Sequence, residues 1–341
     1  MKPELSVVGI DLAKSVFHLV GMDERGQIIL RKRLARGEVM PFMAKLPRVL
    51  VGMEACGGAH DWARQLREQG HEVRLMAPQY VKPYVKTNNN DLRDAEAIAA
   101  AVTRPSMRFV PIKNVAPQAL QALHRVRERL MGARTALVNE MRGLLAEYGI
   151  VLPPGVNTFR TTLKEKLEVE QAKLTPLSQE LFSKLCEEFK KVEAEVVYYD
   201  EKLQAMAITH PESQRLLTIP GIGPITATAL IAAVGAMGGF TNGRQLAAWL
   251  GLVPKQHSTG GQPRLLGISK RGDRYLRKLL IHGARATLRW ARTKTDSRSQ
   301  WIRGVLERRG WNRTAVAVAN KNARIVWALR SRGGVYGEST N

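Results

Sequence analysis

The sequence predicts an α/β region over roughly the first 115 residues, followed by a longer and mainly helical region. In the first region, short runs rich in Val, Ile and Leu alternate with segments of helical spacing. In the second region, apolar residues recur with helical spacing over residues 117–148 and 163–210. With 341 residues and 44% hydrophobic content, the chain is long enough for two or three domains that each bury a core.

The α/β region begins with three predicted strands. The β-rich runs are residues 5–12, 16–22 and 27–34. Two more strands, at 48–53 and 71–76, then alternate with helices at 38–45, 60–68 and 91–103. Three strands followed by helix, strand, helix, strand and helix is the order of elements in ribonuclease H. We therefore expect a ribonuclease-H-like sheet in the N-terminal region.

Four acidic residues lie at ends of these predicted elements. Asp11 ends the first strand, and Glu54 follows the fourth. Asp91 and Asp94 lie nearly one turn apart at the start of the last helix, so they share a face, and Asn90 is a suitable N-cap. Any one of these carboxylates could simply complement a helix dipole or form a turn. Together they predict a site where oxygen ligands bind Mg²⁺ or Mn²⁺ for phosphodiester chemistry.

The charge balance predicts a polyanionic partner. The chain carries 53 Lys and Arg against 30 Asp and Glu, a formal net charge of +23. Residues 255–332 alone hold 20 Lys or Arg and three acidic residues. Nucleic acid is the commonest partner of such a basic chain. Four tryptophans lie between these charges and suit either stacking on unpaired bases or packing in a helical core. They are Trp290, Trp301, Trp311 and Trp327.

Other features narrow the class of protein. The two cysteines, Cys56 and Cys186, lie far apart in the sequence, which argues against a disulfide framework or a structural zinc site. No apolar run reaches the roughly 20 residues that span a bilayer, and the N-terminus has no signal-peptide pattern. We therefore expect an intracellular protein.

Two turns in the second half are candidates for special roles. Residues 219–223 read Ile-Pro-Gly-Ile-Gly ahead of an Ala-rich helix, which is typical of a helix-hairpin-helix motif. The backbone at Gly221 and Gly223 could approach a phosphate, or the glycines could serve only the conformation of a tight turn. Residues 257–261 predict a polar loop. The long helical patterns before these turns suit either antiparallel helices or a coiled coil between two copies.

Several motifs resemble those of a known family. They are residues 8–14, 53–57, 84–98, 220–224, 248–254, 257–261 and 269–273. On these motifs, which span nearly the whole chain, the sequence resembles the DEDD-type transposases of bacterial insertion sequences, in the IS one-ten family and its IS eleven-eleven branch. Three positions depart from the family pattern. Leu92 and Arg93 replace a pair of small residues, and Thr259 stands where a second serine is frequent.

The resemblance implies a site and a mechanism. Asp11, Glu54, Asp91 and Asp94 would form a metal tetrad, and Ser258 would be the nucleophile. Ser258 would attack a phosphodiester and form a phosphoserine link while a 3′-hydroxyl leaves, with Mg²⁺ polarising the phosphate. Family members also resemble RNA-guided recombinases, in which a structured noncoding guide RNA, called a bridge RNA, pairs with donor and target DNA.

The resemblance also implies a division into domains. A ribonuclease-H-like catalytic domain of the Holliday-junction-resolvase type would span 1–115, a coiled-coil arm 116–210, a C-terminal transposase domain 211–335, and a tail 336–341. A homodimer or homotetramer on DNA, in the bacterial cytoplasm and associated with the nucleoid, is expected. The residues expected to contact nucleic acid are Lys86, Gly221, Gly223, Lys270, Arg271, Arg274 and Arg277.

Two other functions are compatible with part of the sequence. A metal-only nuclease of the Holliday-junction type would need the four acidic residues but not Ser258. A non-catalytic DNA-binding protein would gain nothing from carboxylates held against a phosphate backbone, so the presence of all four acidic residues argues against it.

Overall fold

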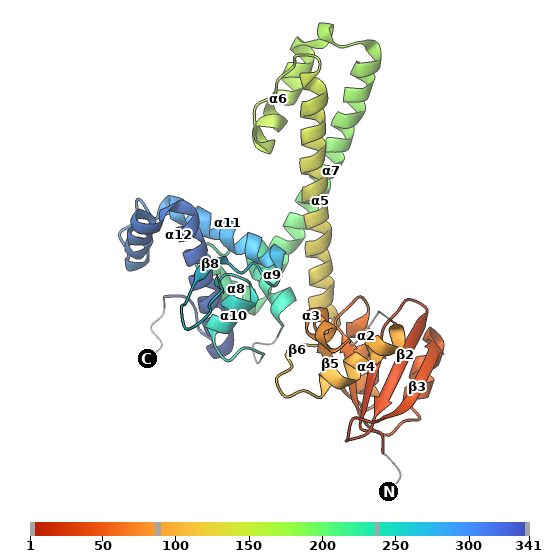
Figure 1. Cartoon of the computed structure of the whole chain (residues 1–341). Coiled ribbons are helices and arrows are strands. Elements are labelled where there is room, and N and C mark those ends of the chain that lie inside the picture. The colour runs from red at the N-terminus through yellow and green to blue at the C-terminus, as the bar shows by residue number, and fades with distance from the viewer. Residues whose placement is uncertain (1–3, 86–89, 236–238, 338–341) are drawn as a thin grey trace. The chain divides into compact units, whose positions relative to one another are not determined.

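The computed structural model describes residues 4–85, 90–235 and 239–337 (Figure 1). The chain divides into two compact units, Met1–Val115 and Ala116–Asn341. Lys86, one of the residues expected to contact nucleic acid, lies outside the described residues.

The first unit is built around a mixed β-sheet. Its strands are β1 (Val7–Asp11), β2 (Val16–Met22), β3 (Ile28–Ala35), β4 (Leu50–Glu54), β5 (Glu72–Met76) and β6 (Phe109–Val110). They lie in the order β3-β2-β1-β4-β5-β6, in which β1, β4 and β5 are parallel and β2, β3 and β6 run antiparallel to their neighbours. The predicted α/β class is confirmed, and this strand order is compatible with a ribonuclease-H-like fold.

Helices cover both faces of this sheet. They are α1 (Val39–Met43), α2 (Ala59–Glu68), α3 (Pro78–Val81) and α4 (Asp91–Val102), with short 3₁₀ turns at Arg36–Glu38 and Lys82–Tyr84. On one face, Ile10 and Met53 are buried in a core with Trp62 of α2. On the other face, Val20 is buried with Ile98 of α4. Alternate residues of β1 and β4 therefore face two separate cores.

Two glycines allow α4 to approach the sheet closely. Gly9 of β1 and Gly52 of β4 are paired in register on neighbouring strands. A Cβ added at Gly9 would lie 2.5 Å from the backbone nitrogen of Ala99, and one added at Gly52 would lie 2.8 Å from Cβ of Val102. Since Cβ atoms do not approach other atoms this closely, glycine at these two positions fixes how near α4 lies to β1 and β4.

The second unit begins with a helical arm, by which we mean residues 116–210. Its helices are α5 (Val115–Ala146), α6 (Val156–Val169) and α7 (Pro176–Thr209). Pro176 is the first residue of α7, and the side chain of Thr175 caps this helix by accepting a hydrogen bond from the Ser178 amide. The three helices share a buried core that includes Phe159, Phe182 and Phe189.

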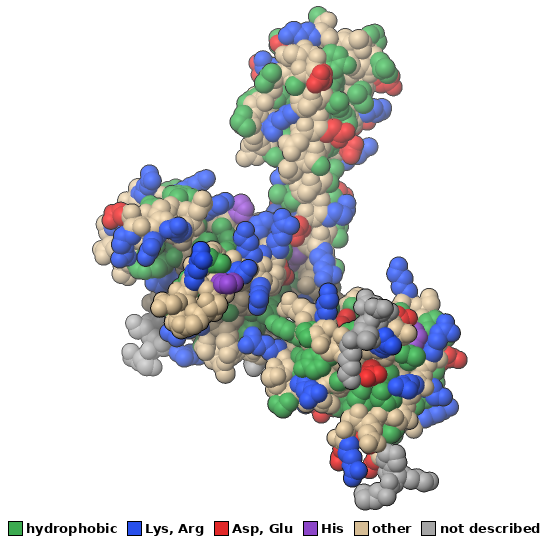
Figure 2. Space-filling model, in the orientation of Figure 1, with side chains coloured by type: hydrophobic (Ala, Val, Ile, Leu, Met, Phe, Trp, Pro, Cys, Tyr) green, Lys and Arg blue, Asp and Glu red, His purple; other side chains and the backbone are tan. Residues whose placement is uncertain are grey.

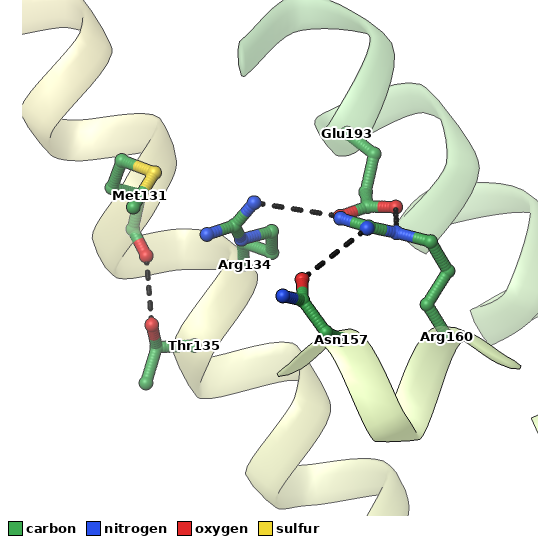
Figure 3. A network of polar contacts seen from close by, with 6 residues as sticks. All are labelled: Met131, Arg134, Thr135, Asn157, Arg160 and Glu193. Carbon is green, nitrogen blue, oxygen red and sulfur yellow. Dashed lines mark hydrogen bonds and ion pairs between the residues drawn. The ribbon is translucent and has the colours of Figure 1, made fainter. Parts of the chain in front are cut away.

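One carboxylate links all three helices of the arm (Figure 3). Glu193 of α7 accepts hydrogen bonds of 2.6 and 2.5 Å from Nε and Nη2 of Arg160 in α6, and it lies 3.4 Å from Nη1 of Arg134 in α5. The hydrogen bonds from Arg160 are the main cause that lowers the pKa of Glu193. Arg127 of α5 also pairs with Asp200 of α7. These pairs show that α5 and α7 run antiparallel within one chain.

The arm is attached to the following helices through a buried histidine. The ring nitrogens of His124 on α5 lie 3.0 Å from the hydroxyl of Tyr275 and 3.1 Å from the hydroxyl of Thr228. Burial lowers the pKa of His124 to about 4, with a further contribution from the charge of Arg127. His124 is therefore neutral at pH 7 and acts as a hydrogen-bonded packing residue.

The remainder of the second unit is mainly helical, as predicted. Its elements are α8 (Pro211–Leu217), α9 (Pro224–Val234), α10 (Gly243–Trp249), β7 (Pro254–Gln256), β8 (Leu265–Ile268), α11 (Arg274–Trp290) and α12 (Ser297–Arg332), the last interrupted by a kink at Gly310. The predicted loop at 257–261 lies in a hairpin whose strands, β7 and β8, the sequence did not predict. Among the described residues, no helix combines the length and apolar character needed to cross a bilayer.

The tryptophans of this region divide between the two roles considered for them. Trp301, Trp311 and Trp327 are half-buried and pack against the main core of the second unit. Trp290, at the end of α11, is 67% exposed. Packing in the core therefore explains three of the tryptophans in part, whereas Trp290 lies on the surface.

We expect Gly9→Ala to destabilise the protein by about 1–3 kcal/mol, because the added methyl overlaps the backbone of α4 and forces the helix away from the sheet. Urea unfolding of the wild type and the variant measures this difference. Gly37→Ala is the matched control, since a Cβ at Gly37 would meet nothing within 4 Å. Equal unfolding midpoints for Gly9→Ala and Gly37→Ala would show that α4 does not depend on this contact.

Candidate metal centre and nucleic-acid interface

Two of the predicted acidic residues lie at the carboxyl ends of neighbouring parallel strands. Asp11 is the last residue of β1, and Glu54 is the last residue of the parallel neighbour β4. Each follows a glycine by two residues, so its side chain points to the same face as Gly9 or Gly52. That face is the one on which α4 packs.

The other two acidic residues come from the first turn of α4. Asn90 caps this helix, as predicted, because its side chain accepts a hydrogen bond of 3.0 Å from the Leu92 amide. Oxygen atoms of Asp11, Asp91 and Asp94 all lie within 4.8 Å of one another. Glu54 lies outside this group but near enough for Asp11 and Asp94 to raise its pKa.

The carboxylates of this cluster repel one another. Burial, followed by the charges of Asp94 and Asp91, raises the pKa of Asp11. Burial and then Asp91 raise the pKa of Asp94, and burial is also the largest cause of the raised pKa of Glu54. A divalent cation between these oxygens would relieve the repulsion, and oxygen-only ligands suit a hard ion such as Mg²⁺ or Mn²⁺. The described residues therefore fit a divalent metal ion.

His18 is a neighbour of the cluster that the sequence analysis missed. It lies on β2, paired directly with Asp11 across the sheet, and it is only 9% exposed. Its Nδ1 lies 3.5 Å from Oδ2 of Asp91 and has no hydrogen-bond partner among the described residues. A small movement of either side chain would let this ring nitrogen form a hydrogen bond to Asp91 and so orient its carboxylate. The signal in the sequence was a lone histidine in a buried strand of the predicted meander.

Ser258 occupies a different kind of environment, in the exposed loop between β7 and β8. Its Oγ accepts hydrogen bonds from Nε2 of Gln256 at 2.9 Å and from the Arg264 amide at 3.3 Å. The loop turns at Gly260 and Gly261, whose φ angles are +55° and +76°. Two consecutive residues with positive φ are typical of the tight turns of hairpins, which explains the Gly-Gly pair. Ser258 and Thr259 belong to the second unit, and the four acidic residues belong to the first.

The two glycines of the helix-hairpin-helix-like segment have different surroundings. Gly221 has a φ of +90°, and a Cβ there would lie 2.6 Å from Oγ1 of Thr287 and 2.8 Å from the carbonyl oxygen of Gly283. This glycine is therefore required for the turn and for packing against α11. Gly223 is exposed and immediately precedes α9. Of the two, only Gly223 leaves space beside its backbone for a ligand.

The four basic residues expected near α11 also differ in exposure. Lys270, Arg271 and Arg274 are exposed and remain candidates for contact with nucleic acid. Arg277 is only 9% exposed, and its Nη1 donates to the carbonyl oxygens of Leu250 and Arg271 at 3.1 and 2.9 Å. We therefore remove Arg277 from the expected interface, because its guanidinium holds a buried turn together. Its charge alone could not reveal this role.

Positive charge is unevenly distributed along the chain. The helical arm contains 13 Lys or Arg and 13 Asp or Glu, so its formal charge is zero, whereas residues 255–332 contain 20 basic and three acidic residues. On the face shown in Figure 2, both signs are mixed over the arm, while Lys and Arg predominate over α11 and α12. The net positive charge that would attract nucleic acid therefore lies outside the arm.

Comparison with known protein families assigns both units to one class. Residues 8–150, which include all four acidic residues, match the family model for DEDD transposases of the IS110 type, described as "Transposase". Residues 213–300, which include Ser258, match the model described as "Transposase IS116/IS110/IS902 family". A chain with these matches is a DNA transposase, and its function is to cut and recombine DNA.

Similarity to individual proteins covers almost the whole chain. It is 53% identical over 333 residues to a probable family 20 transposase of Pseudomonas aeruginosa, covering 97% of this chain and 98% of the relative. The transposase for insertion sequence element IS1111A of Coxiella burnetii is 47% identical, covering 98% and 92%. The transposase for IS1328 of Yersinia enterocolitica is 41% identical, covering 98% and 99%. The chain belongs to the IS110 family of insertion-sequence transposases, which confirms the predicted family.

We expect Asp11→Asn to stabilise the metal-free protein at pH 7. The pKa of Asp11 is higher in the folded protein than its ordinary value, so the ionised carboxylate lowers stability above that pKa, and protonation at lower pH removes the cost. Asn has no such charge. The same change should weaken binding of a divalent metal by at least about tenfold.

Thermal unfolding with and without added Mg²⁺ or Mn²⁺ tests both effects. The wild type should gain Tm on metal addition, and Asp11→Asn should start higher and gain little. Glu68→Gln is a suitable control, because this exposed carboxylate of the same unit lies outside the cluster. If metal raised the Tm of Asp11→Asn as much as that of the wild type, Asp11 would not be a ligand.

Proposed function

We propose that this transposase exchanges DNA strands through a phosphoserine intermediate at Ser258, with Mg²⁺ or Mn²⁺ held by Asp11, Glu54, Asp91 and Asp94. The observation that carries the metal site is the approach of three carboxylates to within 4.8 Å of one another. When bound there, the metal would polarise the phosphate and offset its negative charge. Carboxylates that repel one another in the absence of a cation are well suited to bind a divalent metal ion.

Ser258 supplies the nucleophile in this proposal. Its Oγ forms a bond to phosphorus, the bond from phosphorus to the 3′ oxygen breaks, and the serine proton passes through solvent to the departing 3′ oxygen. The hydrogen bonds from Gln256 and the Arg264 amide would stabilise negative charge that develops on Oγ. Attack by a second DNA 3′-hydroxyl on the phosphoserine would reverse these steps and join new strands.

The proposal assigns the remaining parts of the chain to assembly and binding. Residues 1–115 form the catalytic domain of Holliday-junction-resolvase type, 211–335 the C-terminal transposase domain with its helix-hairpin-helix-like segment, and 336–341 a tail. The arm at 116–210 joins copies as a coiled coil in a homodimer or homotetramer. Exposed apolar side chains on and beside its helices support this role: Val151, Val169 and Leu177 are 73%, 72% and 77% exposed.

Guidance by a bridge RNA is the second part of the proposal. The basic charge is spread over several helices, and the sequence contains neither paired zinc-finger ligands nor an evident basic zipper. A protein that acts at defined sites without its own base-reading element needs another source of sequence information. Base pairing to a bound RNA supplies it, while the protein contacts backbone and shape.

A metal-only nuclease is the alternative, favoured by one observation. Ser258 lies in the second unit, and its described partners, Gln256 and the Arg264 amide, cannot accept its proton as a base. A nuclease that uses an activated water would need the four acidic residues and no serine. Trapping of a covalent protein-DNA adduct distinguishes the two functions.

We expect Ser258→Ala to bind DNA with unchanged affinity and to form no covalent adduct, because the attacking oxygen is absent. Denaturing gel electrophoresis of the protein with labelled element-end DNA and Mg²⁺ measures the adduct. Thr259→Ala is the matched control and should retain it. An adduct that persists in Ser258→Ala and disappears in Thr259→Ala would identify Thr259 as the nucleophile. Cleavage without any adduct in the wild type would support the metal-only nuclease.

We also expect recombination to depend on RNA. Protein stripped of nucleic acid at high salt is mixed with element DNA, with or without a transcript of the noncoding flank of the element. Recombination should require the transcript, and changes confined to its loops should redirect the choice of target. Equally efficient recombination without RNA would overturn guidance and leave the serine chemistry untouched.

A further inference from the structure

A large basic cavity lies within the C-terminal helices. Its volume is about 980 Å³, and it is lined by parts of α10 and α12 and by residues of β7 and β8. Five cationic side chains line it, namely Arg244, Arg313, Lys321, Arg324 and Arg332. No Asp or Glu is among the described residues that line it. This volume is at the upper end of the range of about 300–1,000 Å³ typical of ligand sites.

The five cations have no acidic partner among the described residues, whereas some other basic groups of the second unit do have one. Within the described ranges, none of them forms an ion pair or a hydrogen bond to a carboxylate. By contrast, Arg330 of α12 pairs with Glu212 at 2.9 Å, and Lys278 of α11 pairs with Glu128 at 2.6 Å. Like charges gathered around one cavity repel one another unless an anion lies between them. The cavity therefore favours an anionic ligand.

Two indole rings of the cavity lie next to these cations. Nζ of Lys321 lies 4.2 Å from the ring centroid of Trp301, and the guanidinium carbon of Arg332 lies 5.8 Å from that of Trp327. Trp327 is fixed in place because its Nε1 donates a hydrogen bond of 2.9 Å to the carbonyl of Phe240. A cation beside an aromatic ring provides for both parts of a nucleotide, the phosphate and the base.

We propose that this cavity binds an unpaired nucleotide of a single-stranded segment. Its phosphate would lie among the five cations and draw Lys321 away from Trp301, and its base would stack on the indole face that Lys321 leaves. A duplex cannot fill the cavity in this way, since its bases are stacked inside the helix. The proposal requires only that the transposase binds nucleic acid, and it depends on neither Ser258 nor the metal.

Binding of short oligonucleotides to the full-length protein in EDTA tests the proposal without any strand cleavage. The probes are single strands of about 12 nucleotides, in DNA and RNA forms, with the fluorescent base 2-aminopurine at the centre, and the same strands with that base removed. We expect the intact strand to bind roughly tenfold more tightly than the abasic strand, with quenching of the fluorescence. The form with the larger gain, DNA or RNA, identifies the source of the nucleotide.

Two sets of variants connect this binding to the cavity. Trp301→Phe should keep the difference between intact and abasic strands, and Trp301→Leu, which preserves apolar packing, should lose it. Arg244→Gln combined with Arg324→Gln should reduce the slope of log affinity against log salt by roughly 1.4. The control pair, Arg292→Gln with Arg309→Gln, removes two exposed charges of the same region that do not line the cavity.

Three results would overturn the proposal. Equal affinity of the wild type for intact and abasic strands would exclude stacking of the base. An equal loss of affinity in the cavity pair and the control pair would show that only the overall charge matters. Retention of the base-dependent gain in a folded Trp301→Leu variant would place the base elsewhere. Strand exchange does not enter any of these measurements, so failure here is separate from failure of the serine mechanism.

Discussion

The close contact of α4 with two glycines is the interaction on which the first unit depends. Gly9 and Gly52 are neighbours on parallel strands; Gly9 lies against the backbone of α4, and Gly52 lies against its Val102 and Ile98 side chains. The helix therefore crosses the sheet at short range, and its first turn reaches the edge where β1 and β4 end. The carboxylates of Asp11, Asp91 and Asp94 can meet only because of this short separation. A larger residue at either glycine would move the helix and its two acidic side chains together.

The acidic cluster is costly to fold, and the rest of the unit has to offset that cost. Each of its partly buried carboxylates with a raised pKa opposes folding at neutral pH when no cation is present. Two apolar cores, one on each face of the sheet, supply the opposing free energy. With the metal-binding role proposed for these carboxylates, stability and function have opposite requirements at this end of the sheet, as is common at sites that bind a charged ligand.

Local patterns in the sequence predicted the elements that depend on neighbouring residues. Strands, the cap at Asn90 and the paired acidic residues of α4 follow from short-range spacing. The strands of the hairpin at β7 and β8 did not, because strands of three and four residues depend on pairing with each other rather than on a local pattern. The burial of Arg277 and the position of His18 are likewise long-range facts that charge and composition do not encode. The repeated order of glycine, apolar residue and acid at 9–11 and 52–54 was a usable signal of a close helix.

The zero formal charge of the helical arm has a consequence for how such proteins diversify. An insertion or deletion of whole helical turns in a segment with equal numbers of acidic and basic residues leaves the net charge of the chain nearly unchanged. In the assembly proposed above, the length of the arm, and with it the spacing of the joined copies, could therefore change while the net charge available to nucleic acid stayed the same. Under that proposal, assembly and substrate affinity are separate traits that can evolve at different rates.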